Sequence, residues 1–292
     1  MGDFVHLNEE AAELAARSDK ERLHAIREDR WIDYPHATSV LTVLNEILAR
    51  PRTTRMASVA IYADSGMGKT MLLQRFLAQH RGSFDRASGV ERTPVISVQM
   101  VSRPNEKRFY SQLMDVIGAP PNPRISLTDL ELVVLRVLEQ AELKMLLIDE
   151  THNILASTYN DQRAMLNLLR FISNELRVSI VCFGVADAKE AISGDVQLAR
   201  RFQEYYLPRW QADESFQSLV VGILRNLPLR LPSILSTRAL KRILQMSDGV
   251  TSEIFAILSE AAELAIRSGR ECVDDDLVDR IGPRSALKIT YA

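Results

Sequence analysis

Hydrophobic residues follow two different patterns along this chain. Continuously apolar runs of strand length occupy Met56–Ala63, Thr93–Met100, Lys144–Asp149 and Val178–Val185, and a shorter one lies within Glu204–Trp210. Between them, apolar residues recur at three- and four-residue steps over Met71–His80, Asn105–Ile117, Thr128–Ala141 and Gln162–Leu176. Such steps are typical of helices. Apolar strands that alternate with helices predict a parallel five-stranded sheet covered on both faces, hence an α/β fold.

The two ends of the chain have only the helical pattern. Residues 8–29 are rich in helix formers, and Pro35 interrupts them before the first strand. After Trp210 the strand-like runs stop, and helical patterns continue with Gly249 and Gly269 as helix ends. We therefore predict an N-terminal helical region (1–35), an α/β core (36–209) and a smaller all-helical domain (210–292).

Composition changes this picture little. The chain has 46% hydrophobic and 25% charged residues and a net charge of −2, which fits a globular protein and gives no sign of a nucleic-acid-binding composition. We expect no membrane span and no signal peptide, because no apolar run is long enough and the N-terminus is acidic. Cys182 and Cys272 have no metal-ligand spacing. A cytoplasmic location is expected.

A candidate phosphate loop follows the first strand, in the stretch "YADSGMGKT" (Tyr62–Thr70). Ala63 stands where this motif usually begins with Gly. A loop between a strand and a helix N-terminus suits an anion, and Lys69 would reach the β- and γ-phosphates of ATP while Thr70 would bind Mg²⁺. The residues expected to contact the nucleotide here are Asp64, Ser65, Gly66, Met67, Gly68, Lys69, Thr70 and Met71. The alternative is a structural glycine turn with an exposed lysine.

A carboxylate pair ends the third strand, in "KMLLIDE". Asp149 would hold Mg²⁺, and Glu150 would orient and deprotonate the water that attacks the γ-phosphate. A strand that ends in a solvated acidic turn is the alternative, which the phosphate loop upstream disfavours. His152 follows, and it either senses the γ-phosphate or caps a turn.

Longer phrases of the chain resemble the TniB family of transposition ATPases, which is related to TnsC and more distantly to MuB. The resemblance runs from about Asp29 onward and includes "RWIDYPHA", "DSGMGKT", "LLIDETHNILAST", "YYLPRW" and "LPLRLPS". It implies an AAA+ core with a helical lid, and a bacterial ATPase that uses ATP and Mg²⁺. It also implies assembly as rings or filaments on double-stranded DNA, recruitment of a separate TniA-like DDE transposase, and a TniQ-like targeting partner.

The resemblance also assigns roles to single residues. Arg201 falls at the position of an arginine finger that would contact the γ-phosphate of the next subunit; a surface ion pair is its alternative role. Ile32 and Tyr34 would pack the adenine or serve as plain core. The position of the family's polar sensor, at the end of the fourth strand, holds Val185, so that either Asp187 or no residue would serve as this sensor. The position of the basic sensor in the lid holds Glu253. Both departures suggest slow hydrolysis.

DNA contacts are expected after the second strand. In the resembling proteins this region follows the DNA backbone, and here it carries Arg103, Lys107 and Arg108. A ring would repeat these cations, so that an acidic monomer could still line a basic channel. The alternative is an ordinary charged helix face.

The favoured function is therefore an ATP-dependent, DNA-binding regulator of transposition. Two alternatives stay open. One is an AAA+ ATPase of another pathway, such as a secretion-linked or clamp-loader-like switch. The other is a nucleotide-gated scaffold with negligible hydrolysis.

Overall fold

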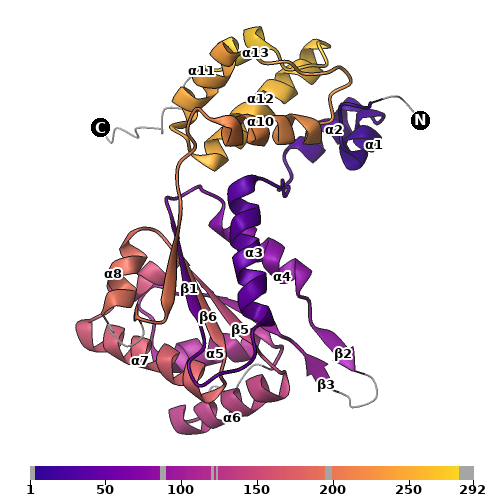
Figure 1. Ribbon diagram of the computed structural model, residues 1–292. Helices are drawn as coiled ribbons and strands as arrows, with labels where there is room; N and C mark the ends of the chain where they lie inside the picture. Colours follow the sequence, from indigo (N-terminus) through magenta and orange to yellow (C-terminus); the bar gives the residue numbers. More distant parts are fainter. Residues whose placement is uncertain (1–3, 86–89, 120–121, 123, 195–198, 283–292) are drawn as a thin grey trace. The chain divides into compact units, whose positions relative to one another are not determined.

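The computed structural model describes residues 4–85, 90–119, 122, 124–194 and 199–282. The chain divides into two compact units (Figure 1). The first unit contains residues 1–38, 66–68 and 209–292, and the second contains residues 39–65 and 69–208. The N-terminal helices, expected as a part of their own, are thus grouped with the C-terminal helices.

The second unit is built on a five-stranded sheet in the order β4-β5-β6-β1-β7. All its strand pairs are parallel. This confirms the predicted parallel sheet. The strands are β1 (Ser58–Ala63), β4 (Val95–Gln99), β5 (Met145–Asp149), β6 (Ser179–Gly184) and β7 (Phe202–Leu207). Every residue of β1, β5 and β6 is buried, because both faces of the central strands are covered.

Helices cover the sheet on both faces. On one face, alternate strand residues such as Ala60, Leu146 and Ile180 pack with residues of several helices in one hydrophobic cluster. These helices are α5 (Glu106–Val116), α6 (Leu127–Gln140), α7 (Tyr159–Glu175) and α8 (Asp187–Ser193). Figure 1 shows α3 (Pro35–Ala49) and α4 (Lys69–Gln79) on the opposite face. Because all strand pairs of the sheet are parallel, the five strands end at the same edge of the sheet, where ligands bind in open α/β sheets.

Three elements were not predicted. A two-stranded antiparallel ribbon consists of β2 (Ser83–Asp85) and β3 (Val90–Arg92). The short helix η1 (Thr151–Ala156) follows β5, and α8 follows β6. Each is short, and none has a long enough run of apolar residues at regular steps to give a periodic signal.

The regular elements in the described part of the first unit are all helices. Its helices are α1 (Glu9–Ala15), α2 (Asp19–Ile26), α10 (Glu214–Asn226), α11 (Thr237–Ser247), α12 (Thr251–Ser268) and α13 (Asp275–Arg280). Gly269 ends α12 with a φ of 73°, as the glycine in the sequence predicted. The fully buried Arg22 of α2 ties the N-terminal helices to this unit: its Nε donates to the Pro228 carbonyl at 2.9 Å, and its guanidinium pairs with Glu271.

Candidate functional site

The phosphate loop begins at the end of β1. Ala63 is a strand residue in register with Leu207 and is fully buried. Gly66 and Gly68 have φ values of 78° and 86°, a region that favours glycine. Ala63 is not among the described residues with positive φ, so alanine is tolerated where the motif usually has glycine.

Lys69 begins helix α4 and is folded back onto the loop. Its side chain is 7% exposed, and its Nζ donates to the carbonyls of Ala63 and Asp64 at 2.8 and 2.9 Å. Burial lowers the pKa of Lys69, while the nearby carboxylates of Glu150, Asp149 and Asp64 act in the opposite direction. Two backbone carbonyls thus accept from this ammonium group, and three nearby carboxylates favour its charged form.

A hydrogen bond joins Thr70, at the start of α4, to Asp149, at the end of β5. The Thr70 hydroxyl donates to Asp149 Oδ2 at 2.9 Å, and the backbone N–H of Glu150 donates to Oδ1 at 2.9 Å. Asp149 is buried at 7% exposure. A hydroxyl and a carboxylate are hard oxygen ligands of the kind that Mg²⁺ binds, so these residues fit that ion. In the described part of the chain, no group of three or more His, Cys, Asp and Glu side chains could hold a metal ion by itself.

Glu150 follows the buried strand in an unusual conformation. Its φ of 54° and ψ of 38° are left-handed, and its side chain is 33% exposed. His152 Nδ1 lies 3.2 Å from Glu150 Oε2. The sequence raised His152 as a candidate but gave no sign of this contact.

Residues Gly66–Gly68 of the loop are grouped with the first unit. The Gly66 carbonyl accepts a hydrogen bond from the Ser252 N–H at 2.9 Å. A Cβ on Gly66 would lie 2.5 Å from Ser252 Oγ and 2.9 Å from Val250 Cγ1, so a side chain at this position would collide with α12 and the residue before it. Met67 is buried. Glycine is thus required at position 66 both for its φ and for space.

Ile32 and Tyr34, the expected adenine contacts, are both buried in the first unit. The Tyr34 hydroxyl lies 3.4 Å from the position of a Cβ on Gly68, next to the loop. The Tyr34 ring packs edge-on against Trp210 at 5.4 Å, and burial raises the pKa of Tyr34 to about 12. A Cβ on Gly222 would lie 3.1 Å from Ile32 Cγ2, so Ile32 packs against α10. Both residues form core contacts, and their adenine role stays a prediction.

The other predicted residues lie apart from this loop. Arg201 Nη1 donates to Asn174 Oδ1 at 2.7 Å. Arg103, Lys107 and Arg108 are exposed at and before the start of α5, and Lys107 Nζ donates to the Ile125 carbonyl at 2.8 Å. The arginine finger predicted at Arg201 would act on a neighbouring subunit, and the other three cations would act on DNA.

Val185, Asp187 and Glu253 are the residues at the predicted sensor positions. Val185 follows β6 and is half-buried, whereas Asp187 is exposed at the start of α8. Glu253 lies in the first turn of α12. The end of β6 therefore has no polar side chain of its own at Gly184, Val185 or Ala186.

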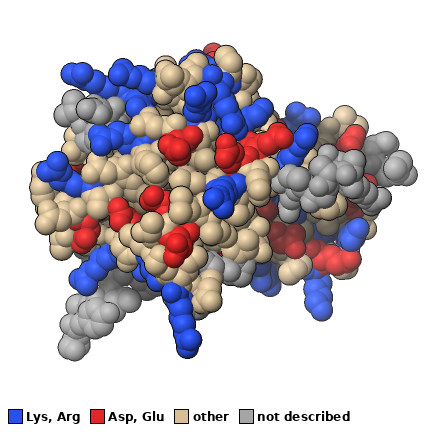
Figure 2. All heavy atoms as spheres, turned by 90° about the horizontal axis from the view of Figure 1, so that it is seen from below, with Lys and Arg blue, Asp and Glu red and all other residues tan. Residues whose placement is uncertain are grey.

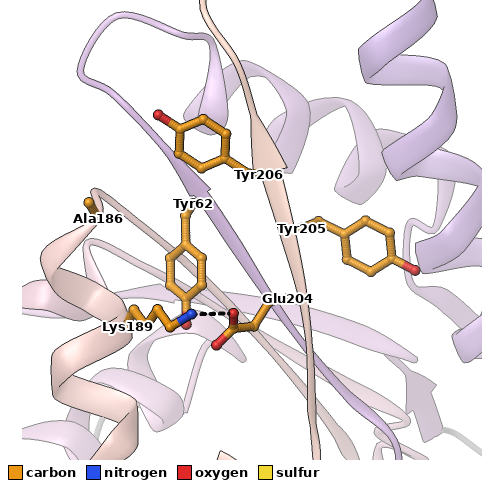
Figure 3. Close-up of a pocket in the computed structure, with 6 residues that line it drawn as sticks. All are labelled: Tyr62, Ala186, Lys189, Glu204, Tyr205 and Tyr206. Carbon is orange, nitrogen blue, oxygen red and sulfur yellow. Dashed lines mark hydrogen bonds and ion pairs between the residues drawn. The ribbon is translucent and has the colours of Figure 1, made fainter.

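A separate pocket of about 360 Å³ lies beside edge strand β7 (Figure 3). Its lining residues are Tyr62, Ala186, Lys189, Glu204, Tyr205 and Tyr206. Lys189 Nζ donates to Glu204 Oε2 at 2.7 Å next to the Tyr62 ring, while Tyr205 points to the other side of the strand. Burial and the charge of Glu204 raise the pKa of Tyr62. None of its lining residues is among the expected nucleotide contacts at residues 64–71.

Charge is mixed on the face shown in Figure 2. Basic and acidic side chains are interspersed there among other residues, and basic ones are more frequent toward the rim. In the described residues, no helix is long and apolar enough to span a membrane.

Comparisons with known proteins agree with this architecture. Among solved structures, the chain is similar to the ORC1 protein of Aeropyrum pernix in complex with DNA, with 20% identity and a TM-score of 0.62 over 88% of this chain and 67% of that one. It is also similar to the ORC2 protein of Aeropyrum pernix in ADPNP–ADP complexes, with 18% identity and a TM-score of 0.61 over 87% and 70%. Cdc6p from Pyrobaculum aerophilum has 16% identity and a TM-score of 0.60 over 85% and 67%.

These likenesses show the AAA+ fold of the ORC and Cdc6 proteins. No curated protein sequence matches the chain. Residues 22–212 match the family described as bacterial TniB protein, which is more than half of the 292 residues. The chain therefore belongs to the TniB family.

Proposed function

We propose that this protein is an ATPase that binds double-stranded DNA in its ATP-bound state and regulates DNA transposition. The observation that carries the proposal is the contact between Thr70 and Asp149, beside the buried Lys69. It joins the phosphate loop to the carboxylate pair, as an ATP site requires. Membership of the TniB family supports the transposition role.

Binding of the triphosphate would use the positive charge of Lys69. Its ammonium group now donates to two loop carbonyls, and it would exchange these for the β- and γ-phosphate oxygens. The glycines at 66 and 68 allow the backbone to approach the phosphates closely. Asp64, Ser65, Met67 and Met71 complete the loop, and Ile32 and Tyr34 are the candidates for the adenine. The ORC2 structures with ADPNP and ADP show that this fold accepts an adenine nucleotide in another protein.

Hydrolysis would use the carboxylate pair. Thr70 and Asp149 would hold Mg²⁺, which neutralises charge on the phosphates when it is bound. Glu150 is partly exposed next to this pair, so its carboxylate can accept a proton from the attacking water. Val185 and Glu253 provide no basic or amide group at the sensor positions, so the rate should be low without partners.

Arg201 would complete the site of a neighbouring protomer in a ring or filament. It lies before the edge strand β7, and its guanidinium reaches Asn174 of α7 within the isolated chain. An experiment with mixed protomers tests this role: a Lys69→Ala subunit with intact Arg201 should restore hydrolysis to an Arg201→Ala subunit. No recovery in the mixture would argue against action in trans.

DNA contacts would come from Arg103, Lys107 and Arg108. All three are exposed near the start of α5, and cations of this kind bind phosphate irrespective of base sequence. The ORC1 structure in complex with DNA supports DNA binding as a property that this fold can carry. The expected protein partners are a TniA-like DDE transposase and a TniQ-like targeting protein.

The experiment that tests the proposal is binding to plasmid DNA at low salt, with ATP, with ADP and without nucleotide. ATP-dependent binding, with rings or filaments visible by electron microscopy, would support it. Binding that is equal in all three conditions, or absent, would contradict it.

A second candidate function is a nucleotide-gated scaffold with negligible hydrolysis. The apolar end of β6 at Val185 and the acidic Glu253 favour this candidate. Phosphate release measured with and without DNA and transposase separates the two, because the scaffold would bind ATP without turnover in either condition.

A further inference from the structure

Glu150 and His152 form a side-chain pair at the end of β5. His152 Nδ1 lies 3.2 Å from Glu150 Oε2, and the two side chains are 28% and 33% exposed. The Nδ1 atom itself is buried, and the contact does not have the in-line geometry of a hydrogen bond. Glu150 is thus the charged neighbour of a buried ring nitrogen that has no hydrogen-bond partner in the described part of the chain.

The backbone holds both members of the pair in place. Glu150 has left-handed φ and ψ values of 54° and 38°, and its N–H donates to Asp149 Oδ1 at 2.9 Å. Its carbonyl accepts from the Asn153 N–H at 2.9 Å. Thr151 lies between Glu150 and His152 in the sequence, and its hydroxyl donates to the Ile148 carbonyl at 3.2 Å. A non-glycine residue in this conformation is costly and persists only where its surroundings impose it.

The end of the neighbouring strand β6 lies close to the histidine. A Cβ on Gly184, at the end of β6, would lie 3.8 Å from His152 Nδ1 and 3.7 Å from the His152 backbone N. The same Cβ would lie 2.5 Å from Ala188 Cβ. Glycine at 184 is therefore needed for the packing of α8, and the imidazole lies next to this strand end, which has no polar side chain of its own.

We propose that His152 is a positioning residue, which fixes the Glu150 carboxylate for the attack of water on ATP. This inference rests on the proposed ATPase function. The imidazole lies against Oε2 of the carboxylate, with Nδ1 at 3.2 Å, and so limits the positions that this side chain can take; Oε1 would then be the atom that accepts the proton of the water. A glutamate without such a partner loses this orientation, because several rotamers of its side chain become accessible and the productive one must then be selected at an entropic cost.

The test compares three replacements of His152 by ATP turnover and by nucleotide binding. His152→Leu removes the polar contact, and kcat should fall by about 10- to 100-fold while KM and the Kd for ATP change less than about threefold. His152→Asn should recover most of kcat, because its amide lies near the position of Nδ1. His152→Gln should not, because its amide lies near the position of Nε2.

His24 provides a matched control, because it forms another histidine–glutamate pair. His24 Nε2 lies 3.5 Å from Glu28 Oε1, and both side chains are exposed, at 80% and 61%. His24→Leu should leave kcat and KM unchanged. Thermal unfolding of each variant checks that the fold is retained.

Several results would overturn the proposal. One is an unchanged or raised kcat in folded His152→Leu. Another is an equal kcat in the Asn and Gln variants, which also decides the case if the Leu variant does not fold. A loss of ATP affinity that equals the loss of kcat would show a binding role instead. Absence of hydrolysis by the wild-type protein would overturn the proposed ATPase function and this inference together. Hydrolysis by the wild type, with an unchanged kcat on replacement of His152, would overturn this inference alone.

Discussion

The Thr70 hydroxyl donates a hydrogen bond to Asp149 Oδ2 at 2.9 Å, although the two residues are 79 positions apart. Parallel strands make this possible, because β1 and β5 end at the same edge of the sheet. Thr70 belongs to the Gly-Lys-Thr motif, and Asp149 belongs to the Asp-Glu motif.

Thr70→Val should weaken magnesium-dependent ATP binding by roughly 10- to 100-fold. The change keeps the shape but removes the hydroxyl, and hydrogen bonds to charged groups contribute about 1.5–3 kcal/mol. Titration of ATP with Mg²⁺ and with EDTA measures the effect. Thr70→Ser is the control, since it keeps the hydroxyl and should stay within a few-fold of wild type. A loss in the Ser variant as large as that in the Val variant would contradict the role of the hydroxyl, because serine retains it.

Glu150→Gln should lower ATP turnover by about 10²- to 10⁴-fold, the range for loss of a general base. Glutamine keeps the size of the side chain but cannot take a proton, so ATP should stay bound and the DNA-bound state should last longer. Single-turnover hydrolysis and dissociation from labelled DNA measure the two effects. Undiminished turnover in this variant would exclude Glu150 as the base.

Simultaneous replacement of Arg103, Lys107 and Arg108 by Gln should weaken DNA binding and its salt dependence. The slope of log affinity against log salt should become shallower by about 0.9 for each phosphate contact that is lost. Binding to a duplex at several salt concentrations provides this slope.

The control for the DNA prediction carries the same change of charge elsewhere. Lys20, Lys144 and Lys241 are all exposed, and their replacement by Gln should leave the slope unchanged. If both triple variants reduce the slope equally, the effect is one of net charge, and α5 is not the contact surface.

Glu271→Gln should lower the free energy of unfolding at neutral pH by about 2–4 kcal/mol, because it removes the less exposed of the two carboxylates that pair with the buried Arg22 and leaves only the exposed Asp19. Burial of Glu271 by itself raises its pKa, but hydrogen bonds from Arg22 and the Arg230 N–H, with their charges, outweigh it and lower the pKa below the ordinary 4.5. A lowered folded-state pKa means stability that is present above 4.5 and lost as pH falls through the folded-state value.

Denaturant unfolding as a function of pH measures this loss. The wild-type free energy of unfolding should fall from about pH 4.5 downward, and the Gln variant should show a flatter profile there. Asp276→Asn is the control: Asp276 forms an exposed pair with Arg270, at 71% and 35% exposure, and its loss should cost less than about 1 kcal/mol. Parallel pH profiles for wild type and Glu271→Gln would contradict the assigned role of this carboxylate.

The sequence predicted the sheet well, because the central strands are continuously apolar and each helix has a regular apolar face. The runs at 56–63 and 144–149 became β1 and β5, which are buried at every position. The order of strands was not predicted, since apolar runs do not indicate which strand lies beside which. The ribbon of β2 and β3 was missed, because strands of three residues are too short for a pattern.

The sequence predicted those residues of the site whose position within a short motif indicates their role. Lys69, Thr70 and Asp149 come together as their motifs imply. Contacts that depend on tertiary packing were not predictable. The ion pair of Arg22 with Glu271 joins α2 to the segment between α12 and α13, 249 positions away, and neither residue belongs to a motif. The contact of Gly66 with Ser252 likewise depends on the packing of α12.

The most direct test of the account is calorimetric titration of MgATP into the wild-type protein and into Lys69→Ala, with Lys144→Ala as the exposed-lysine control. The account predicts saturable binding by the wild type and the control, and an affinity for Lys69→Ala that is at least about 30-fold weaker, since removal of one partner of a buried, hydrogen-bonded charge pair costs about 2 kcal/mol or more. Absence of ATP binding by the wild type, or equal binding by Lys69→Ala, would contradict it.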